Sequence, residues 1–351
     1  MKPATVAAAD IVTAQLSPRL EGTTLPLIRH PGNPILTREA IPDIPPNLVD
    51  VSSVFNPGAT VYDGRTILLL RVQNRGRKTF LLLAESADGV GFRVRNQPVE
   101  LRGLESVSQT VHHLYDPRIT RIGDDYFILL AMDLDDGCRL GVARTTDFES
   151  FEFIGMSSEQ DIRNGVLFPE RYDGKYLRLA RPNRLAPAGG GASGDEIYLY
   201  SSENLIDWTV LGAADDQPAP VLSGRWHYWD EFIGSGPPPV KTHLGWLHIY
   251  HGVATHLGGG IYQAGVALLD LDDPSRLLAR CSQNILEPRE LYEQVGQVPN
   301  VVFPSGMTVD RTDDDGFAEP DSMVRVYYGA ADSVVCLATS TVRELIAACF
   351  E

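Results

Sequence analysis

Short apolar runs recur along the whole chain, and turn residues separate them. Runs such as 246–250 and 324–328 are rich in Val, Ile, Leu, Tyr and Trp, which predicts strands. Tight hairpin turns are expected at Asp63-Gly64, Gly123-Asp124 and Asp173-Gly174. Helical periodicity is confined to Ser340–Phe350 and the region from Pro288 to Val295. The pattern therefore predicts an all-β protein.

One unit recurs five times: a proline, a short strand, a turn, a strongly apolar strand and a third apolar strand. The repeated prolines are 52 to 70 residues apart, at Pro57, Pro117, Pro169, Pro239 and Pro304. Repeats of a four-stranded unit are typical of β-propellers. We predict one five-bladed β-propeller domain over residues 29–351, after an N-terminal extension over 1–28, with a C-terminal helix or strand closing the ring. The alternative is a pair of β-sandwiches.

The innermost strand of each propeller blade lines the central channel. The inner strands are expected to begin beside the repeated prolines, so one mouth of the channel should be faced by Asn56, Asp116, Phe168, Pro238 and Phe303. Basic side chains end the second strands of copies one, three and four at equivalent places, at Arg71, Arg181 and His251. Lys241 follows a run of prolines that would hold it at a fixed point.

Charge changes what these basic residues imply. The chain has 351 residues and a formal net charge of −16. A protein this acidic is a poor partner for nucleic acid or an anionic membrane, because the phosphate term is repulsive. Arginines that end apolar strands are costly to bury without an anion. Their convergence on one mouth therefore predicts a local site for a phosphate or a carboxylate.

Two further residue types bear on the chemistry. Asp116 precedes a proline at a strand start, where it is either a general acid or the side chain of an Asx turn. Trp226, Trp229 and Trp246 either stack on sugar rings or pack in the core.

Other sequence features narrow the class of protein. Metal-ligand spacing, a dinucleotide fingerprint and a P-loop are all missing from the sequence, so neither a metal nor a cofactor is expected. The four sparse cysteines and the lack of a signal-like or membrane-spanning apolar run predict a cytoplasmic protein with reduced thiols.

Six motifs resemble, in order, those of glycoside hydrolase family 130. They are Phe55-Asn56-Pro57-Gly58-Ala59, Tyr115-Asp116-Pro117-Arg118-Ile119-Thr120, Leu167-Phe168-Pro169-Glu170, the stretch from Gly234 to Thr242, Ile249-Tyr250-His251-Gly252-Val253 and the stretch from Tyr327 to Asp332. The resemblance runs from about Arg29 to Thr339. It implies a five-bladed propeller and an inverting β-mannoside phosphorylase, or in some members a hydrolase.

The resemblance also implies roles for individual residues. Asp116 matches the general acid, which protonates the glycosidic oxygen through the 3-hydroxyl of mannose. Phosphate, the co-substrate, attacks the anomeric carbon from the opposite face and is expected to be held by Lys241, His251, Arg139 and Arg181, with Arg163 as a further match. The mannose unit is expected to be held by Asn56, Arg71 and Asp332, with Tyr115 beside them.

Three functions remain open from the sequence. The first is a glycosyltransferase-type phosphorylase acting on a β-1,2- or β-1,4-linked mannoside, which yields α-mannose 1-phosphate. The second is an inverting hydrolase on the same scaffold, with Glu170 or Glu231 as the base. The third is a non-catalytic propeller that binds glycans or proteins. Many family members carry Glu where Tyr115 stands, which leaves the substrate subgroup open, and a homo-oligomer is possible.

Overall fold

The computed structural model describes residues 26–159, 161–183, 193–214 and 217–351. Strands dominate it, as the apolar pattern predicts. Two short 3-10 helices span Arg38–Ala40 and Leu104–Ser106, and the α-helices are α2 (Leu291–Gln294) and α3 (Val342–Cys349). Among the described residues, no helix has the length and apolar character needed to span a bilayer.

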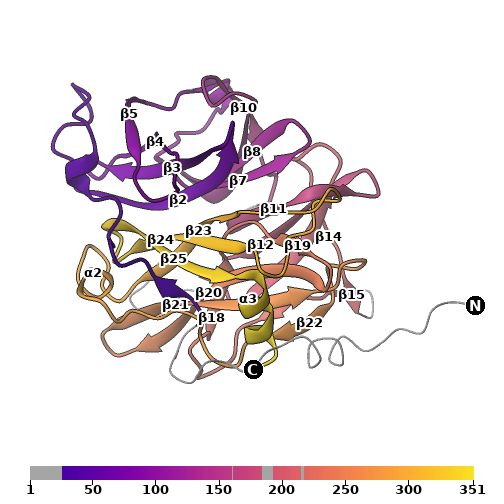
Figure 1. Ribbon diagram of the computed structural model, residues 1–351. Helices are drawn as coiled ribbons and strands as arrows, with labels where there is room; N and C mark the ends of the chain where they lie inside the picture. The colour runs from indigo at the N-terminus through magenta and orange to yellow at the C-terminus, as the bar shows by residue number, and fades with distance from the viewer. Residues whose placement is uncertain (1–25, 160, 184–192, 215–216) are drawn as a thin grey trace, which may run out of the picture.

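Among the described residues, five sheets form the blades of a propeller, and their strands pair antiparallel except for a short parallel pairing in blade two (Figure 1). Blade one contains β2 (Ser53–Tyr62), β3 (Arg65–Gln73), β4 (Thr79–Ser86) and β5 (Arg93–Pro98). Blade two contains β7 (His113–Ile122), β8 (Asp125–Leu134), β9 (Gly137–Thr145) and β10 (Phe151–Met156), with β6 (Leu101–Arg102) at its edge. Blade three contains β11 (Ile162–Tyr172), β12 (Lys175–Pro182), β13 (Glu196–Ser202) and β14 (Thr209–Val210), with β17 (Leu222–Ser223) on β13.

The remaining blades carry more irregular strands. Blade four contains β18 (Phe232–Ser235), β19 (Val240–Thr242), β20 (Gly245–His256), β21 (Gly259–Leu269) and β22 (Leu277–Arg280). Blade five contains β23 (Val302–Val309), β24 (Met323–Ala330), β25 (Val334–Thr341) and β1 (Ile28–Arg29). A two-stranded ribbon of β15 (Ala213–Ala214) and β16 (Gln217–Pro218) lies outside the blades. The fold is therefore the predicted five-bladed propeller.

The predicted hairpin turns occur where expected. Tyr62 pairs with Arg65, Ile122 with Asp125 and Tyr172 with Lys175, so two residues make each turn. Asp63 and Gly64 have φ of 47° and 71°, which is the left-handed geometry that a two-residue hairpin of this type requires.

An N-terminal strand completes the fifth blade. β1 pairs antiparallel with β25, and its indigo ribbon lies beside the yellow β25 in Figure 1. The prediction that a C-terminal element closes the ring is therefore wrong, because the outermost strand of the last blade comes from the start of the domain. Helix α3 forms as predicted, and its apolar face packs against β21, β22 and β25. Residues 1–25 of the predicted extension lie outside the described residues.

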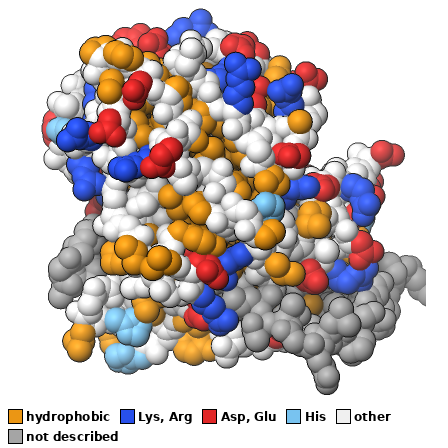
Figure 2. Space-filling view, turned by 60° about the vertical axis from the view of Figure 1, so that its left-hand side comes forward, with side chains coloured by type: hydrophobic (Ala, Val, Ile, Leu, Met, Phe, Trp, Pro, Cys, Tyr) orange, Lys and Arg blue, Asp and Glu red, His pale blue; other side chains and the backbone are white. Residues whose placement is uncertain are grey.

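Apolar side chains between neighbouring blades make the core. Phe168, predicted to face the channel mouth, is 1% exposed and packs edge-on against Trp246 at a centroid distance of 5.0 Å. The expectation for Phe168 is therefore wrong, because the proline of the third copy lies deeper along its strand than those of the first two. Trp246 is likewise a core residue, 2% exposed. Figure 2 shows one face of the surface, on which acidic and basic side chains are interspersed.

Candidate active site

A β-bulge recurs on the inner strands at one level of the channel. The register shifts between Phe55 and Gly58 in β2, and between Tyr115 and Arg118 in β7. Asn56 and Asp116 lie inside these bulges with φ of 46° and 51°, a left-handed conformation that Asn and Asp tolerate better than most residues. A bulge turns a side chain out of the regular pleat, which is how the sequence presents both polar groups to the centre.

The third blade repeats the bulge without a proline. Its register shifts between Arg163 and Val166, and Asn164 has φ of 53°. Asn164 is therefore the structural counterpart of Asn56 and Asp116, and the sequence reasoning missed it by following prolines. An Asn-Gly pair, Asn164-Gly165, was the available signal, since both residues favour left-handed backbone.

Two neighbours hold the carboxylate of Asp116. Asn56 donates from Nδ2 at 3.0 Å and Arg71 from Nη1 at 2.9 Å, both to Oδ1. The guanidinium of Arg71 is sandwiched between the rings of Phe55, 4.4 Å from the centroid, and Tyr115, at 4.6 Å. The site therefore brings together Asn56, Arg71, Tyr115 and Asp116, as the sequence predicts.

A second carboxyl group belongs to this group. Asp332, in the turn between β24 and β25, has a pKa raised to about 6 because it is buried; Arg71 lowers this pKa and Asp116 raises it. Asp332 thus shares the electrostatic environment of Asp116 and Arg71, as expected of a substrate-binding position. Near pH 6 its charge changes.

Basic side chains occupy equivalent positions on the second strands of three blades. Arg71 pairs with Phe55, Arg181 with Arg163, and His251 with Gly234, so the three predicted basic residues do occupy equivalent second-strand positions. Arg163 faces Arg181 across the same level and is one of its electrostatic neighbours. Within the described part of the chain, buried Nε atoms of Arg71, Arg163 and Arg181 have no hydrogen-bond partner.

Burial sets the protonation of these groups. It lowers the pKa of Arg181 to about 10, with a further contribution from Arg163, so Arg181 stays positively charged at pH 7. Burial, together with Arg181 and Arg118, places the pKa of His251 well below its usual value. His251 is therefore neutral at pH 7 and can offer a hydrogen bond, but not the charge that the sequence reasoning assigned to it.

Tyr262 is a further member of the cluster that the sequence did not reveal. Its ring lies 5.9 Å from that of His251 and 6.4 Å from that of Phe303. Burial raises its pKa, and its charged neighbours are Arg181, Asp332, Arg163 and Asp116. A tyrosine on the second strand of a hairpin carries no distinctive pattern in the sequence, so only the fold identifies it.

Close packing brings two of these side chains into place. A Cβ on Gly234 would lie 2.5 Å from Cε1 of His251, and a Cβ on Gly329 would lie 1.9 Å from Oδ1 of Asn56. Both positions therefore need glycine, because any larger residue would displace a group of the site.

Lys241 does not join the cluster. It lies on β19, where it pairs with Trp246, five residues along β20 from His251. At about 3.3 Å per residue, this places the backbone of Lys241 roughly 16 Å from that of the histidine along the strand. Its ammonium contacts Glu170 at 2.7 Å. The expectation that Lys241 surrounds the same point as Arg181 is wrong, because the proline run carries the chain to the far end of the blade.

Arg139 also has partners elsewhere. It donates to Asp136 at 2.7 Å and to the carbonyl of Glu159 at 3.2 Å, and it is 6% exposed. Its prediction as a member of the same cluster is not supported by these contacts, whereas Arg163 takes a place there.

The arrangement can perform one kind of chemistry. A carboxyl group held by an amide and a guanidinium lies near buried cations and a neutral imidazole whose Nδ1, within the described residues, has no partner. Buried Nε donors of arginine that lack a partner favour an anion as acceptor. The site therefore suits proton transfer at one end and anion binding at the other.

Comparisons with known proteins agree with this chemistry. The family model described as beta-1,4-mannooligosaccharide phosphorylase matches residues 27–351. A beta-1,4-mannooligosaccharide phosphorylase of Ruminococcus albus is 30% identical over 91% of this chain and 89% of its own length. A 4-O-beta-D-mannosyl-D-glucose phosphorylase of Bacteroides fragilis is 31% identical over 86% of this chain and 76% of its own. The solved beta-1,2-mannobiose phosphorylase of Listeria innocua is 26% identical, covers 92% of this chain and 99% of its own, and superposes with a TM-score of 0.75.

Proposed function

The chain belongs to glycoside hydrolase family 130, and from this premise we propose that it catalyses the inverting phosphorolysis of a β-mannoside, with Asp116 as the general acid. The enzyme is a mannoside phosphorylase, and its substrates are a mannooligosaccharide and inorganic phosphate. It transfers a mannosyl group to phosphate, which makes it glycosyltransferase-like in reaction type. Some of the named relatives act on β-1,4 linkages and others on β-1,2 linkages. The linkage that this enzyme cleaves is therefore the property to determine by experiment.

Each group of the site has a place in this reaction. A phosphate oxygen forms a bond to the anomeric carbon while the bond to the leaving oxygen breaks, and the leaving oxygen receives the proton of Asp116 by way of the mannose 3-hydroxyl. Inversion then gives α-mannose 1-phosphate and a sugar shortened by one unit. Asn56, Arg71 and Asp332 are placed to hold the mannose unit. Arg163 and Arg181 supply the charge that binds the phosphate, and His251 supplies a hydrogen bond.

One observation carries phosphorolysis over hydrolysis: the buried Nε atoms of Arg71, Arg163 and Arg181 have no hydrogen-bond partner among the described residues, although the terminal nitrogens of these arginines contact Asp116, Asp133 and Asn183. An inverting hydrolase needs a second carboxylate about 6.5–9.5 Å from the acid. Glu170 is bound to Lys241, and it lies six residues along β11 from the bulge at Asn164. Glu231 precedes β18 and faces a separate cavity. Neither proposed hydrolytic base therefore lies beside Asp116, whereas the unpartnered Nε atoms of the arginines support an anion site there.

The test is to follow phosphate in both directions. Incubation with α-mannose 1-phosphate and a panel of mannose and glucose acceptors is expected to release inorganic phosphate. Turnover of β-mannobiose is expected to require phosphate. Free mannose formed at the same rate without phosphate would show a hydrolase instead.

Asp116→Asn tests the acid. The amide keeps the hydrogen bonds that hold the side chain but cannot donate a carboxylic proton, so kcat should fall about 10²–10⁴-fold. Far-UV circular dichroism and the melting temperature should match the wild type. A variant with wild-type turnover would mean that another residue is the acid.

A further inference from the structure

An open cavity lies at the rim of blade four, outside the site described above. Its volume is about 650 Å³. It lies between the loop 223–231, the β20–β21 hairpin and the segment 283–300, and its walls include Tyr228, Trp229, Glu231, Gln263, Asn284 and His256. We call it the rim cavity. Trp226 stands beside it, with its ring 4.5 Å from that of the lining residue His227, and is 76% exposed.

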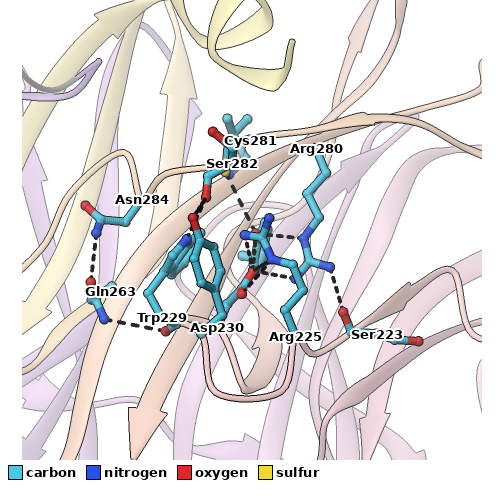
Figure 3. A network of polar contacts seen from close by, with 12 residues as sticks. Ser223, Arg225, Trp229, Asp230, Gln263, Arg280, Cys281, Ser282 and Asn284 are labelled. Atoms are coloured by element: carbon cyan, nitrogen blue, oxygen red, sulfur yellow. Dashed lines mark hydrogen bonds and ion pairs between the residues drawn. The ribbon is translucent and has the colours of Figure 1, made fainter. Parts of the chain in front are cut away.

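A buried charge network fixes the loop that carries these aromatic residues (Figure 3). Asp230 is fully buried and accepts hydrogen bonds from Arg225 Nη2 at 2.7 Å and Arg280 Nη2 at 2.5 Å. Arg280 also donates to the carbonyl of Ser223 at 2.6 Å, at the start of the loop. Breaking such a buried pair is strongly destabilising. The loop is therefore held in one conformation.

The aromatic rings on the loop are tied in place as well. Tyr228 Oη and Trp229 Nε1 both donate to the carbonyl of Ser282, at 2.8 and 3.0 Å. Asn284 donates to Gln263 at 2.8 Å, and Gln263 reaches the carbonyl of Trp229 (Figure 3). Because hydrogen bonds hold the neighbouring rings of Tyr228 and Trp229, the loop presents the exposed indole of Trp226 in a fixed position.

The chemistry of the rim cavity selects its ligand. Its lining combines aromatic rings with amide, hydroxyl, imidazole and carboxylate groups, and Lys and Arg are missing from it. Glu231 would repel an anion, and the charge of Glu287 is paired with Arg289 at 2.7 Å. Neutral polyhydroxylated ligands suit such a surface, since their C–H faces pack on aromatic rings and their hydroxyls bond to planar polar groups. A sugar fits these requirements, whereas a phosphate ester does not.

The rim cavity lies on the same side of the propeller as the site. His251 pairs with Gly234, and beyond it β20 continues through Ala254 and Thr255 to His256, which line the cavity. At about 3.3 Å per residue, His256 is roughly 16 Å further along the strand. The two places also share β21: Tyr262 lies beside His251, whereas the next residue, Gln263, points to the opposite face of the sheet and lines the cavity, so a chain that joins the two places passes over the hairpin end of blade four. A sugar chain leaving the site can therefore run outward over blade four.

We propose that the rim cavity, with Trp226 beside it, is a distal subsite that binds sugar units of an oligomeric substrate beyond the bond that is cleaved. This inference rests on the proposed function, because it takes the mannoside substrate as given and concerns only how many sugar units the enzyme binds. The subsite makes the enzyme prefer chains of several units to a disaccharide.

Chain-length dependence tests the proposal. For wild-type protein, kcat/KM should rise from mannobiose to mannotetraose in the series, β-1,4 or β-1,2, that the enzyme accepts. Trp226→Ala should lower kcat/KM for the tetraose about 10-fold, which corresponds to about 1.4 kcal/mol of lost stacking and burial, and leave mannobiose within about 2-fold. Trp226→Phe should restore most of the loss. Tyr172→Ala, an exposed aromatic in the β11–β12 hairpin, is the matched control and should change neither substrate.

A binding measurement separates this inference from the proposed function. Intrinsic fluorescence of the wild type, without phosphate, should respond to mannotetraose at lower concentrations than to mannobiose, and Trp226→Ala should remove that difference. Equal effects of Trp226→Ala on both substrates, or no effect, would overturn the subsite. A change in oligomeric state on size-exclusion with unchanged chain-length dependence would overturn it too, by making this face a contact between copies. Mannotetraose binding at Trp226 without phosphate-dependent turnover would instead contradict the proposed function alone.

Discussion

At the scale of single residues, the contacts that fix the guanidinium of Arg71 also orient the carboxylate of Asp116. The guanidinium of Arg71 lies between two rings and donates to the carboxylate of Asp116. Tyr115, which stands where many family members carry glutamate, contacts Arg71 through its ring. We therefore expect it to act by positioning this cation.

Tyr115 can be tested with a matched pair of variants. Tyr115→Phe keeps the ring and loses only the contacts of the hydroxyl with Asp133 and Cys138, so kcat should change less than about 3-fold. Tyr115→Ala loses the cation–π contact, worth about 0.5–2 kcal/mol, and should lower kcat about 10-fold. The readout is kcat at saturating phosphate with thermal stability measured in parallel. Equal activities of the two variants would contradict the positioning role.

Asp332 makes stability depend on pH. Its folded pKa, about 6, lies above the unfolded value of about 3.9, so the charged form destabilises the fold fully above pH 6 and less as pH falls towards 4. Asp332→Asn should therefore raise the free energy of unfolding by about 2–3 kcal/mol at pH 8 and by roughly half as much at pH 5. Urea denaturation at both pH values measures this. An equal gain in the free energy of unfolding at both pH values would mean that the charge of Asp332 does not destabilise the fold.

At the scale of elements, register rather than sequence proximity brings the cations together. Arg163 and Arg181 face each other across β11 and β12, and His251 takes the corresponding place on β20. Lys241, ten residues before His251 in the sequence, lies at the other end of its blade, because β19 folds back on the start of β20. The pairing of strands thus places Lys241 and His251, which are close in sequence, at opposite ends of a blade, and brings together arginines from different strands.

This placement gives opposite expectations for two cations. Arg181→Ala should raise the KM for phosphate by at least about 10-fold, since a buried charged partner of the anion is lost. Lys241→Ala should leave that KM within about 2-fold, because the contacts it removes, a partly exposed ion pair with Glu170 and a cation–π contact with Phe317, lie away from the cluster. Initial rates at varied phosphate and saturating mannoside provide the measurement. A large phosphate effect of Lys241→Ala would contradict the geometry of the site.

At the scale of the whole molecule, closing the ring joins the two ends of the domain. β1 supplies the outermost strand of blade five, and Arg29 at its end donates to the fully buried carboxylate of Glu293, 2.8 Å away. The same carboxylate accepts from the hydroxyl of Tyr328 at 2.8 Å. One buried group therefore links the first strand, the segment before blade five and its second strand.

Loss of this link should weaken the whole fold. Arg29→Ala leaves the carboxylate of Glu293 buried and unpaired, which should lower the free energy of unfolding by about 3–5 kcal/mol. Arg38→Ala is the control, because its pair with Glu39 is exposed on both sides and contributes at most about 1 kcal/mol. Denaturant unfolding, followed by circular dichroism and tryptophan fluorescence, measures both. Similar losses for the two variants would show that closure does not depend on this pair.

The net charge also acts at this scale. A chain of −16 repels phosphate at a distance, yet the site must bind it. In the proposed reaction the wholly or partly buried arginines offset this repulsion locally, because the attraction between charges is stronger away from water than the field of a distant, screened surface.

The sequence by itself determined the strands, the hairpin turns, the fivefold repeat and the residues around Asp116. Each of these is a local property: apolar alternation selects strands, Asp-Gly pairs select turns, and Asn-Pro or Asp-Pro marks a bulge that turns one side chain inward. Only the tertiary structure decided that β1 closes the ring, that Tyr262 lies in the site, that Arg163 rather than Arg139 lies beside Arg181, and that Lys241 and Arg139 have partners elsewhere. These outcomes depend on which strands pair and in what register, and register is set by packing between distant segments, which no short stretch of sequence records.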